Sequence, residues 1–121
     1  MKSNKKISFY LLSICFLINV LYVSPSFSLS TQEDLFKNAL DLSSNGEFNL
    51  ALKQWNSYLE LFPDDPAALS NRGNIKLVIG DPKSAIVDQD KAINLDPDQV
   101  DPYINRGIAE ESLGLWLKAK N

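Results

Sequence analysis

The chain has 121 residues, of which 45% are hydrophobic and 22% charged, and this length allows one domain with a modest core. It contains no histidine, and its single cysteine, Cys15, lies in an N-terminal apolar run, so the remainder has no imidazole base, thiol nucleophile or Cys/His metal site. The formal net charge is −3 even with three lysines in the first six residues, so the rest of the chain is more acidic and lacks the clustered cations of nucleic-acid-binding proteins. We therefore expect a non-catalytic protein that holds no cofactor or metal and binds no nucleic acid.

The N-terminus has the three-part plan of a secretory signal peptide. Three lysines precede a mainly apolar run at residues 7–23, and small residues follow it up to Ser28. We expect cleavage after Ser28, so that residues 1–28 form the signal peptide and the protein is exported to a periplasm or a thylakoid lumen. In the alternative interpretation residues 7–23 stay uncleaved and anchor the chain in a membrane, although this run lies at the lower limit for a spanning helix.

A first helical hairpin is expected after a short linker at residues 29–31. Its first helix is predicted to begin at Ser30 or Thr31, either of whose hydroxyls can cap the first turn, and to end at Gly46, which favours the left-handed conformation of a C-cap. A second helix is predicted over residues 47–61, where apolar residues recur three and four apart before a proline. Two antiparallel helices joined by such a short turn form an αα-hairpin.

The hairpin then repeats. Asp65 is expected to cap the next helix and Pro66 to occupy its first turn, where the missing N–H has no cost. Gly80 ends this helix, and a second helix is predicted over residues 82–95.

A third unit begins at Asp101 but is incomplete. Its first helix is expected to run to about Leu113, where Gly114 turns the chain into a barely begun second helix. The predicted organisation is a signal peptide or anchor at 1–28, a linker at 29–31, repeats at 32–65 and 66–99, and a partial third repeat at 100–121.

A period of 34 residues relates these units. Gly46, Gly80 and Gly114 follow one another at that spacing, and an Asn-Arg-Gly triplet recurs at residues 71–73 and 105–107. Self-similarity at a fixed period predicts a repeat architecture, in which each unit is one supersecondary element stacked on the next.

The unit resembles the tetratricopeptide repeat (TPR), which has a small residue in its first helix, an alanine in its second and a proline at the exit. The matching positions, over residues 32–121, are Ala39, Gly73 and Gly107, then Ala51, Ala85 and Ala119, then Pro63 and Pro97. Tyr58 departs from the pattern, because a small residue is usual at its position. The Asn-Arg-Gly triplets resemble a subclass found in exported TPR proteins of photosynthetic lineages. The resemblance implies an all-α superhelical solenoid of αα-hairpins, with two full repeats and a partial third.

The resemblance also implies a scaffold that binds a peptide segment or a partner protein on the concave face lined by the first helices. The residues expected there, which form an apolar groove with amide and acidic groups, are Phe36, Leu40, Ser43, Ser70, Asn74, Leu77, Ile104, Ile108 and Glu111. In the alternative interpretation several of them only pack one repeat against the next. TPR domains that hold chaperone tails clamp a carboxylate with basic residues, and Phe36 and Leu40 occupy the equivalent positions, which argues against that ligand class.

Several charged residues allow more than one interpretation. Arg72 is either a ligand contact or, as we favour, the partner of Asp88 on its own second helix, whereas Arg106 is expected to have no such partner. Three aspartates within residues 96–101 imitate the alternating carboxylates of a calcium loop but lack its glycine and closing glutamate, so a turn and a helix cap are expected.

The C-terminal unit is expected to expose apolar surface, whereas Trp55 and Trp116 are expected in the core. The third unit has no complete second helix to cover its apolar residues, which are Tyr103, Ile104, Ile108 and Leu113. We therefore predict marginal stability or self-association through this uncapped end.

The alternative function is that of a membrane-anchored structural or assembly subunit held by residues 7–23.

Overall fold

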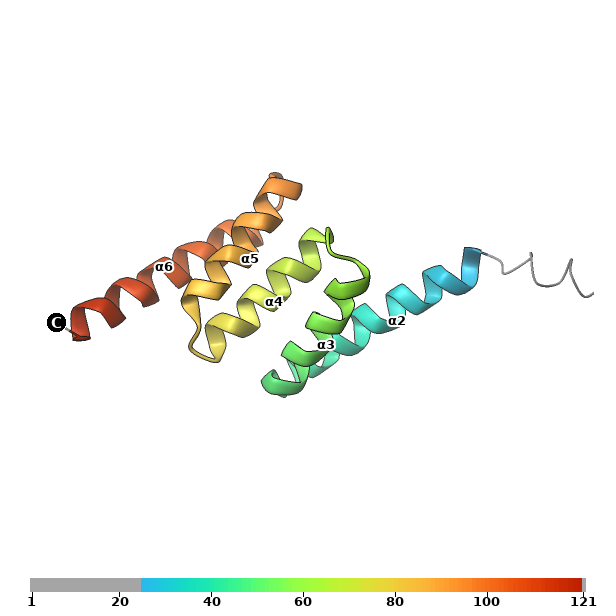
Figure 1. Ribbon diagram of the computed structural model, residues 1–121, viewed down its shortest axis with the longest axis horizontal. Helices are drawn as coiled ribbons and strands as arrows, with labels where there is room; N and C mark the ends of the chain where they lie inside the picture. Colours follow the sequence, from blue (N-terminus) through green and yellow to red (C-terminus); the bar gives the residue numbers. More distant parts are fainter. Residues whose placement is uncertain (1–24, 121) are drawn as a thin grey trace, which may run out of the picture. The chain divides into compact units, whose positions relative to one another are not determined.

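The computed structural model describes the backbone of residues 25–120 and the side chains of residues 32–114. The helices of this part of the chain are α2 (Pro25–Ser44), α3 (Phe48–Leu61), α4 (Pro66–Val78), α5 (Pro82–Leu95) and α6 (Asp101–Lys120) (Figure 1). The described backbone forms helices and turns without a strand, which confirms the all-α prediction. The chain divides into two units after Thr31, and, apart from the start of α2, the description below concerns the unit that begins at Gln32. The apolar run at residues 7–23 and the side chain of Trp116 lie outside the described residues.

Helix α2 begins at Pro25, so the start predicted at Ser30 or Thr31 is wrong. A serine or threonine is compatible with a helix interior as well as with a cap, and proline suits a first turn, where its missing N–H is not needed. The residues between Pro25 and Thr31 include neither glycine nor a second proline, so no residue in this stretch interrupts the helix.

Glycine closes the turns inside the two complete hairpins. Gly46 and Gly80 have φ angles of +79° and +89°, in the left-handed region that glycine adopts without strain. In each turn the residue after the glycine donates its N–H to the carbonyl oxygen five residues earlier, at 3.0 and 2.8 Å. The left-handed C-cap predicted at Gly46 is therefore confirmed, and Gly80 ends its helix, as predicted, with the same conformation.

Aspartates cap the starts of α4 and α5. Asp65 Oδ1 accepts a hydrogen bond from the N–H of Ala68 at 3.0 Å, and Asp81 Oδ1 accepts one from the N–H of Ser84 at 3.2 Å. Pro66 occupies the first turn of α4, as predicted, and Pro82 occupies the first turn of α5. The hydrogen bonds from Ser84 stabilise the ionised carboxylate and lower the pKa of Asp81 from its usual value.

The turn predicted at Gly114 is not formed, because α6 continues through Gly114 to Lys120 without a positive φ. Gly80 is followed by Asp81 and Pro82, which together start a new helix. Gly114 is instead followed by leucine and tryptophan, neither of which caps a helix. A glycine inside a helix costs only about 1 kcal/mol relative to alanine, which the helix-forming residues around it offset.

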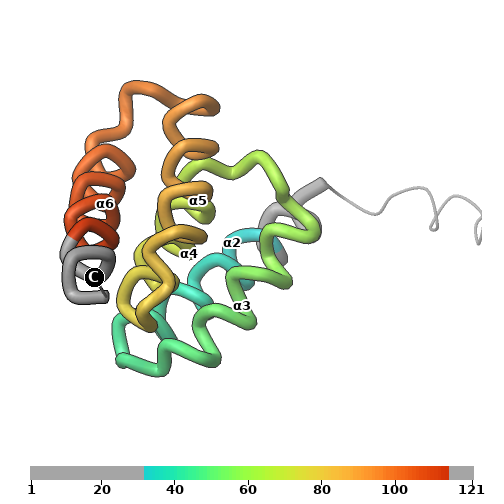
Figure 2. The backbone as a smooth tube through the Cα atoms, turned by 60° about the vertical axis from the view of Figure 1, so that its left-hand side comes forward, coloured from blue at the N-terminus to red at the C-terminus, as the bar shows by residue number. Residues whose placement is uncertain are grey.

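The second helices pack between the first helices. Helix α3 contacts α4, α5 contacts both α4 and α6, and α4 and α6 also contact each other (Figure 2). An edge-to-face contact between Phe36 and Trp55, with ring centroids 5.0 Å apart, joins α2 to α3. This is the packing expected of stacked αα-hairpins.

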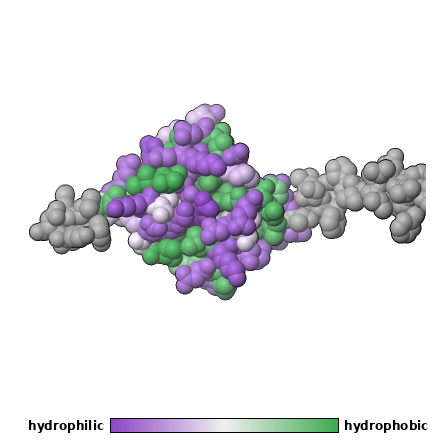
Figure 3. Space-filling model, in the orientation of Figure 1, coloured by the Kyte–Doolittle hydropathy of each residue, from purple (hydrophilic) through white to green (hydrophobic). Residues whose placement is uncertain are grey.

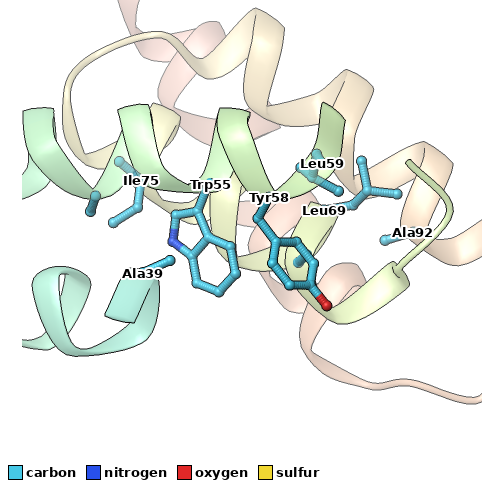
Figure 4. Packing of buried hydrophobic residues seen from close by; sticks show 9 residues of the cluster. Ala39, Trp55, Tyr58, Leu59, Leu69, Ile75 and Ala92 are labelled. Atoms are coloured by element: carbon cyan, nitrogen blue, oxygen red, sulfur yellow. The ribbon is translucent and has the colours of Figure 1, made fainter. Parts of the chain in front are cut away.

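The core is built around one face of α3. Trp55 is fully buried, as predicted, and its ring lies beside Ala39 of α2 (Figure 4). The buried members of this cluster are Ala39, Ala51, Trp55, Tyr58, Leu59, Ala68, Leu69, Ile75 and Ala92. Four alanines among them let helices approach closely around the large aromatic rings.

Tyr58 links three helices, which accounts for its departure from the TPR pattern. Its hydroxyl accepts a hydrogen bond from Gln32 Nε2 at 3.0 Å and donates one to Asp65 Oδ2 at 2.6 Å. Burial of the phenol and its donation to the Asp65 carboxylate raise the pKa of Tyr58. A small side chain at this position would leave α2 and the cap of α4 without this connection.

Helices α4 and α5 leave no space for a side chain at Gly73. A Cβ atom there would lie 2.5 Å from Gln89 Nε2 and 3.2 Å from the carbonyl oxygen of Ala85. Gln89 is fully buried, and its Nε2 donates to the carbonyl oxygen of Ser70 at 3.0 Å, so it cannot move aside freely. At Gly107, the equivalent position in α6, no described atom lies within 4 Å of such a Cβ.

These two glycines provide a matched pair of alanine variants. We predict that Gly73→Ala lowers the free energy of unfolding by about 1–2 kcal/mol, because overpacking against Gln89 exceeds the gain in helix propensity. Gly107→Ala is predicted to raise it by about 0.5–1 kcal/mol, because only the propensity changes. Urea denaturation followed by circular dichroism at low protein concentration measures both values. Equal effects of the two substitutions would contradict the close approach at Gly73.

Candidate partner-binding face

The residues predicted for the concave face lie on the first helices of the three units, and several are accessible. Leu40 on α2 and Ile104 and Ile108 on α6 expose 39%, 55% and 47% of their surfaces, respectively. Asn74 on α4 and Glu111 on α6 are also exposed, and Leu77 is half-buried. Exposed apolar side chains are spread over α2 and α6, with an exposed amide on α4 between them in the sequence.

Two of the predicted residues on α2 also hold the core. Phe36 is half-buried and packs edge-to-face on Tyr58, with ring centroids 5.5 Å apart, as it does on Trp55. Ser43 Oγ accepts a hydrogen bond from Trp55 Nε1 at 2.9 Å and donates one to the carbonyl oxygen of Ala39 at 2.8 Å. Both residues therefore have an intramolecular role, which the alternative interpretation of this face anticipates.

Ser70 is buried between the helices of the second and third units. Its carbonyl oxygen accepts the hydrogen bond from Gln89, and its Oγ lies 3.5 Å from Asn105 Nδ2 on α6. Ser70 thus links α4 to both α5 and α6.

A pocket of about 270 Å³ lies between α4 and α6 and includes three of the predicted residues, Ser70, Asn74 and Ile104. The other residues that line it, which the sequence analysis does not assign to this face, are Ala67, Asn71, Gln99, Asp101 and Asn105. The sequence contains a signal that could have assigned two of these residues to the groove. Asn71 and Asn105 are 34 residues apart and each directly follows a predicted face residue, so periodicity could have placed them beside the groove.

The lining of this pocket is rich in amide groups and contains no lysine or arginine. Asparagine and glutamine side chains offer both donors and acceptors, which match the N–H and C=O groups of a peptide backbone. Asp101 adds a carboxylate at one end, and Ile104 adds an exposed apolar side chain. The pocket therefore suits a neutral or basic extended segment better than an acidic one.

One face of the molecule has a surface of mixed character. Figure 3 shows separate apolar patches between hydrophilic residues on the face drawn there. Such a distribution differs from the continuous apolar interface of an obligate oligomer.

Arg72 is engaged within the chain, which confirms its predicted pairing with Asp88. Its Nε and Nη2 atoms donate to the two carboxylate oxygens of Asp88 at 2.8 and 2.7 Å, and its Nη1 donates to Asn56 Oδ1 at 3.1 Å. Lys76 Nζ lies 2.8 Å from the same carboxylate, whose side chain is only 4% exposed. Arg72 is thus a structural residue of the α4–α5 hairpin.

Arg106 also has an intramolecular partner, so the prediction that it has none is wrong. Its Nη1 donates to Asp90 Oδ1 on α5 at 3.0 Å, and its Nε lies 3.7 Å from Glu110 Oε1. The prediction considered only the repeat's own second helix, whereas the partner belongs to the second helix of the preceding repeat. The hydrogen bond to Asp90 favours the charged guanidinium and raises the pKa of Arg106.

The aspartates after α5 form a turn, as predicted. Asp96 Oδ1 accepts the N–H of Asp98 at 3.3 Å, Asp96 Oδ2 accepts Gln99 Nε2 at 2.9 Å, and Asp101 begins α6. Within the described residues no group of three or more Cys, His, Asp or Glu side chains is placed to hold a metal ion. None of the helices in that part of the chain is both long enough and apolar enough to cross a membrane.

No protein-family model matches the chain. Over 81 residues, or 67% of its length, the chain is 28% identical to the TPR repeat-containing thioredoxin TDX of Arabidopsis thaliana. The match covers 21% of that protein, so the chain spans about a fifth of the length of this curated relative.

Two solved TPR domains have the same fold. The Sgt2 TPR domain from Aspergillus fumigatus superposes with a TM-score of 0.66 at 22% identity, over 74% of this chain and 60% of that one. The TPR2B domain of yeast Sti1, solved in a complex with pHsp70, superposes with a TM-score of 0.66 at 24% identity, over 73% of this chain and 70% of that one. The fold of the described residues is therefore the αα-hairpin solenoid of TPR domains, as the sequence resemblance implies.

Proposed function

We propose that the protein is a non-catalytic scaffold whose first helices bind an extended segment of a partner protein. The observation that carries this proposal is the amide-lined pocket between α4 and α6, which adjoins exposed apolar residues on α6. The TPR fold supports it, because solenoids of stacked helical hairpins present extended concave surfaces to their ligands. The concave position of this surface and its use in binding are part of the proposal.

The proposed ligand has two chemical features. Asn71, Asn74 and Asn105 can exchange hydrogen bonds with its backbone, which fixes an extended conformation without requiring a particular sequence. Ile104 and Ile108, one helical turn apart and 55% and 47% exposed, favour apolar side chains on the ligand.

The charge of the groove distinguishes the proposed ligand from an acidic tail. Asp101 and Glu111 lie on α6 beside the exposed isoleucines, and the pocket contains no cation. An acidic peptide would place carboxylates near these groups without compensation, whereas a neutral or basic peptide would not. We therefore propose a ligand chemistry that differs from carboxylate clamping.

Peptide selection tests this proposal even though the partner is unidentified. Random linear peptides displayed on phage are selected on the immobilised wild-type protein, and synthetic copies of the selected peptides are titrated by fluorescence anisotropy. We predict that Ile108→Glu weakens binding about tenfold or more and that Asn74→Ala weakens it about fivefold, because one loses an apolar contact and the other a hydrogen bond.

Val87→Glu is the matched control, because Val87 is a 66% exposed apolar residue on α5, a second helix. Circular dichroism verifies that each variant is folded. Binding that is lost in Val87→Glu and kept in Ile108→Glu would show that the ligand lies on the opposite side of the repeats.

The proposal includes export of the scaffold by residues 1–28, to a periplasm or a thylakoid lumen. The basic end, the apolar run and the small residues before Leu29 support it. We predict a mature N-terminus at Leu29 when the protein is isolated from its compartment and measured by intact-mass spectrometry. An intact Met1 in the membrane fraction would instead support an anchored assembly subunit held by residues 7–23.

A further inference from the structure

One side of α6 has no described helix against it. Helices α4 and α5 contact α6 on the side of the buried residues Pro102 and Ala109. On another side Tyr103 is 43% exposed, the side chain of Glu110 is 60% exposed, and the space at Gly107 is open. The outer face of α6 is defined here by Tyr103, Arg106, Gly107 and Glu110, which recur at helical spacing.

The equivalent face of α4 shows how such a surface is covered. Its residues, each 34 positions earlier, are Leu69, Arg72, Gly73 and Lys76. Helix α5 lies on it in antiparallel orientation, touches Gly73 closely, and supplies the Asp88 carboxylate to both cations. A covered face of this type therefore requires close helix approach at the glycine and a carboxylate opposite the arginine.

Arg106 has only half of the contacts that Arg72 makes. Nη1 of Arg106 donates to Asp90 Oδ1. In the same way, Nη1 of Arg72 donates to Asn56 Oδ1, and Asn56 lies 34 residues before Asp90. The Nε and Nη2 atoms of Arg72 form a two-pronged contact with Asp88, whereas Nη2 of Arg106 forms no hydrogen bond with a described residue and its Nε lies 3.7 Å from Glu110 Oε1 on its own helix. The Nη2 atom of Arg106 is thus available to a second carboxylate, and its Nε has only this long contact with Glu110.

The outer face of α6 differs from the equivalent face of α4 at one charged position. This difference determines which charges a helix packed on the outer face of α6 must carry. Glu110 stands where α4 has Lys76, so the outer face of α6 carries one cation and one acid instead of two cations. A helix that delivered a lone carboxylate, as α5 does, would meet repulsion from Glu110. A helix that carries an acid and a cation in the reverse order would satisfy both groups.

Helix α6 itself has that order. When two copies of α6 lie antiparallel around a two-fold axis at the level of residue 108, midway between Arg106 and Glu110, each Arg106 faces the Glu110 of the other copy. Gly107 then lies near the crossing, where the absence of a side chain allows the helices to approach closely. The exposed ring of Tyr103 flanks the contact at each end and adds apolar area.

We propose that a second copy of this chain binds the outer face of α6, with the two α6 helices antiparallel and two reciprocal Arg106–Glu110 contacts. The contact is isologous, as two-fold dimers require. It goes beyond the proposed scaffold function, because it uses a side of α6 that does not include Ile104 and Ile108. One helix pair is a small interface, so the dimer is expected to be weak and dependent on concentration.

Charge reversal tests the proposal in the full-length chain, kept reduced and in one detergent throughout. The first variant, Asp90→Arg/Arg106→Glu, inverts the ion pair with α5 but places an acid opposite Glu110. The second, Glu110→Arg, places two cations opposite each other. Each variant alone is expected to dimerise about tenfold more weakly than wild type in sedimentation velocity, because like charges then meet twice in each interface.

An equimolar mixture of the two variants is expected to regain the wild-type dimer constant, because each copy then faces its opposite charge at both contacts. Lys83→Glu on α5 is the control for a change of charge outside the outer face of α6. Circular dichroism confirms that the variants are folded. Association through residues 7–23 would be the same in every sample, so equal association of wild type, variants and mixture overturns the proposal. A monomeric wild type, or a mixture that fails to recover, overturns it as well.

Discussion

The second hairpin depends on the carboxylate of Asp88. This side chain is 4% exposed, and it accepts a two-pronged contact from Arg72 and an ion pair from Lys76. A buried carboxylate without such partners would be strongly destabilising, so α5 must place Asp88 between these two residues of α4. Gly73 lies beside them and allows α5 to come close. Together these contacts set the register of α5 on α4, and α6 then packs on both helices.

The groove and the outer face of α6 follow from this register. Ser70 receives Gln89 from α5 at its carbonyl oxygen and Asn105 from α6 at its hydroxyl, so the amide-lined pocket is shaped by the same helix packing. The spacing of a helix separates Ile104 and Ile108 from Tyr103 and Glu110, which lie on different sides of α6. One helix can therefore contribute an apolar and amide surface to a peptide and a self-complementary charged surface to a second copy.

Periodicity predicts most of the fold because the turns and caps are local. The left-handed glycines, the caps at Asp65 and Asp81 and the Arg72–Asp88 pair depend on residues within one hairpin, whose spacing the sequence shows directly. The prediction of a turn at Gly114 is wrong because a glycine permits a turn without requiring one. The partner of Arg106 and the pocket amides were missed because they belong to contacts between successive repeats. Tyr58 shows the same limit, because its role depends on Gln32 and Asp65 from two other helices.

The most direct test of this account compares two aspartates that both form ion pairs. Asp88→Asn is predicted to lower the free energy of unfolding by about 3 kcal/mol, because two cations lose their buried carboxylate. Asp64→Asn, which removes a pair with Lys91 from a side chain that is 71% exposed, is predicted to change it by less than about 0.5 kcal/mol. Urea denaturation of both variants, followed by circular dichroism, provides the comparison. A loss at Asp88 as small as that at Asp64 would contradict the claim that this carboxylate sets the packing of α5 on α4.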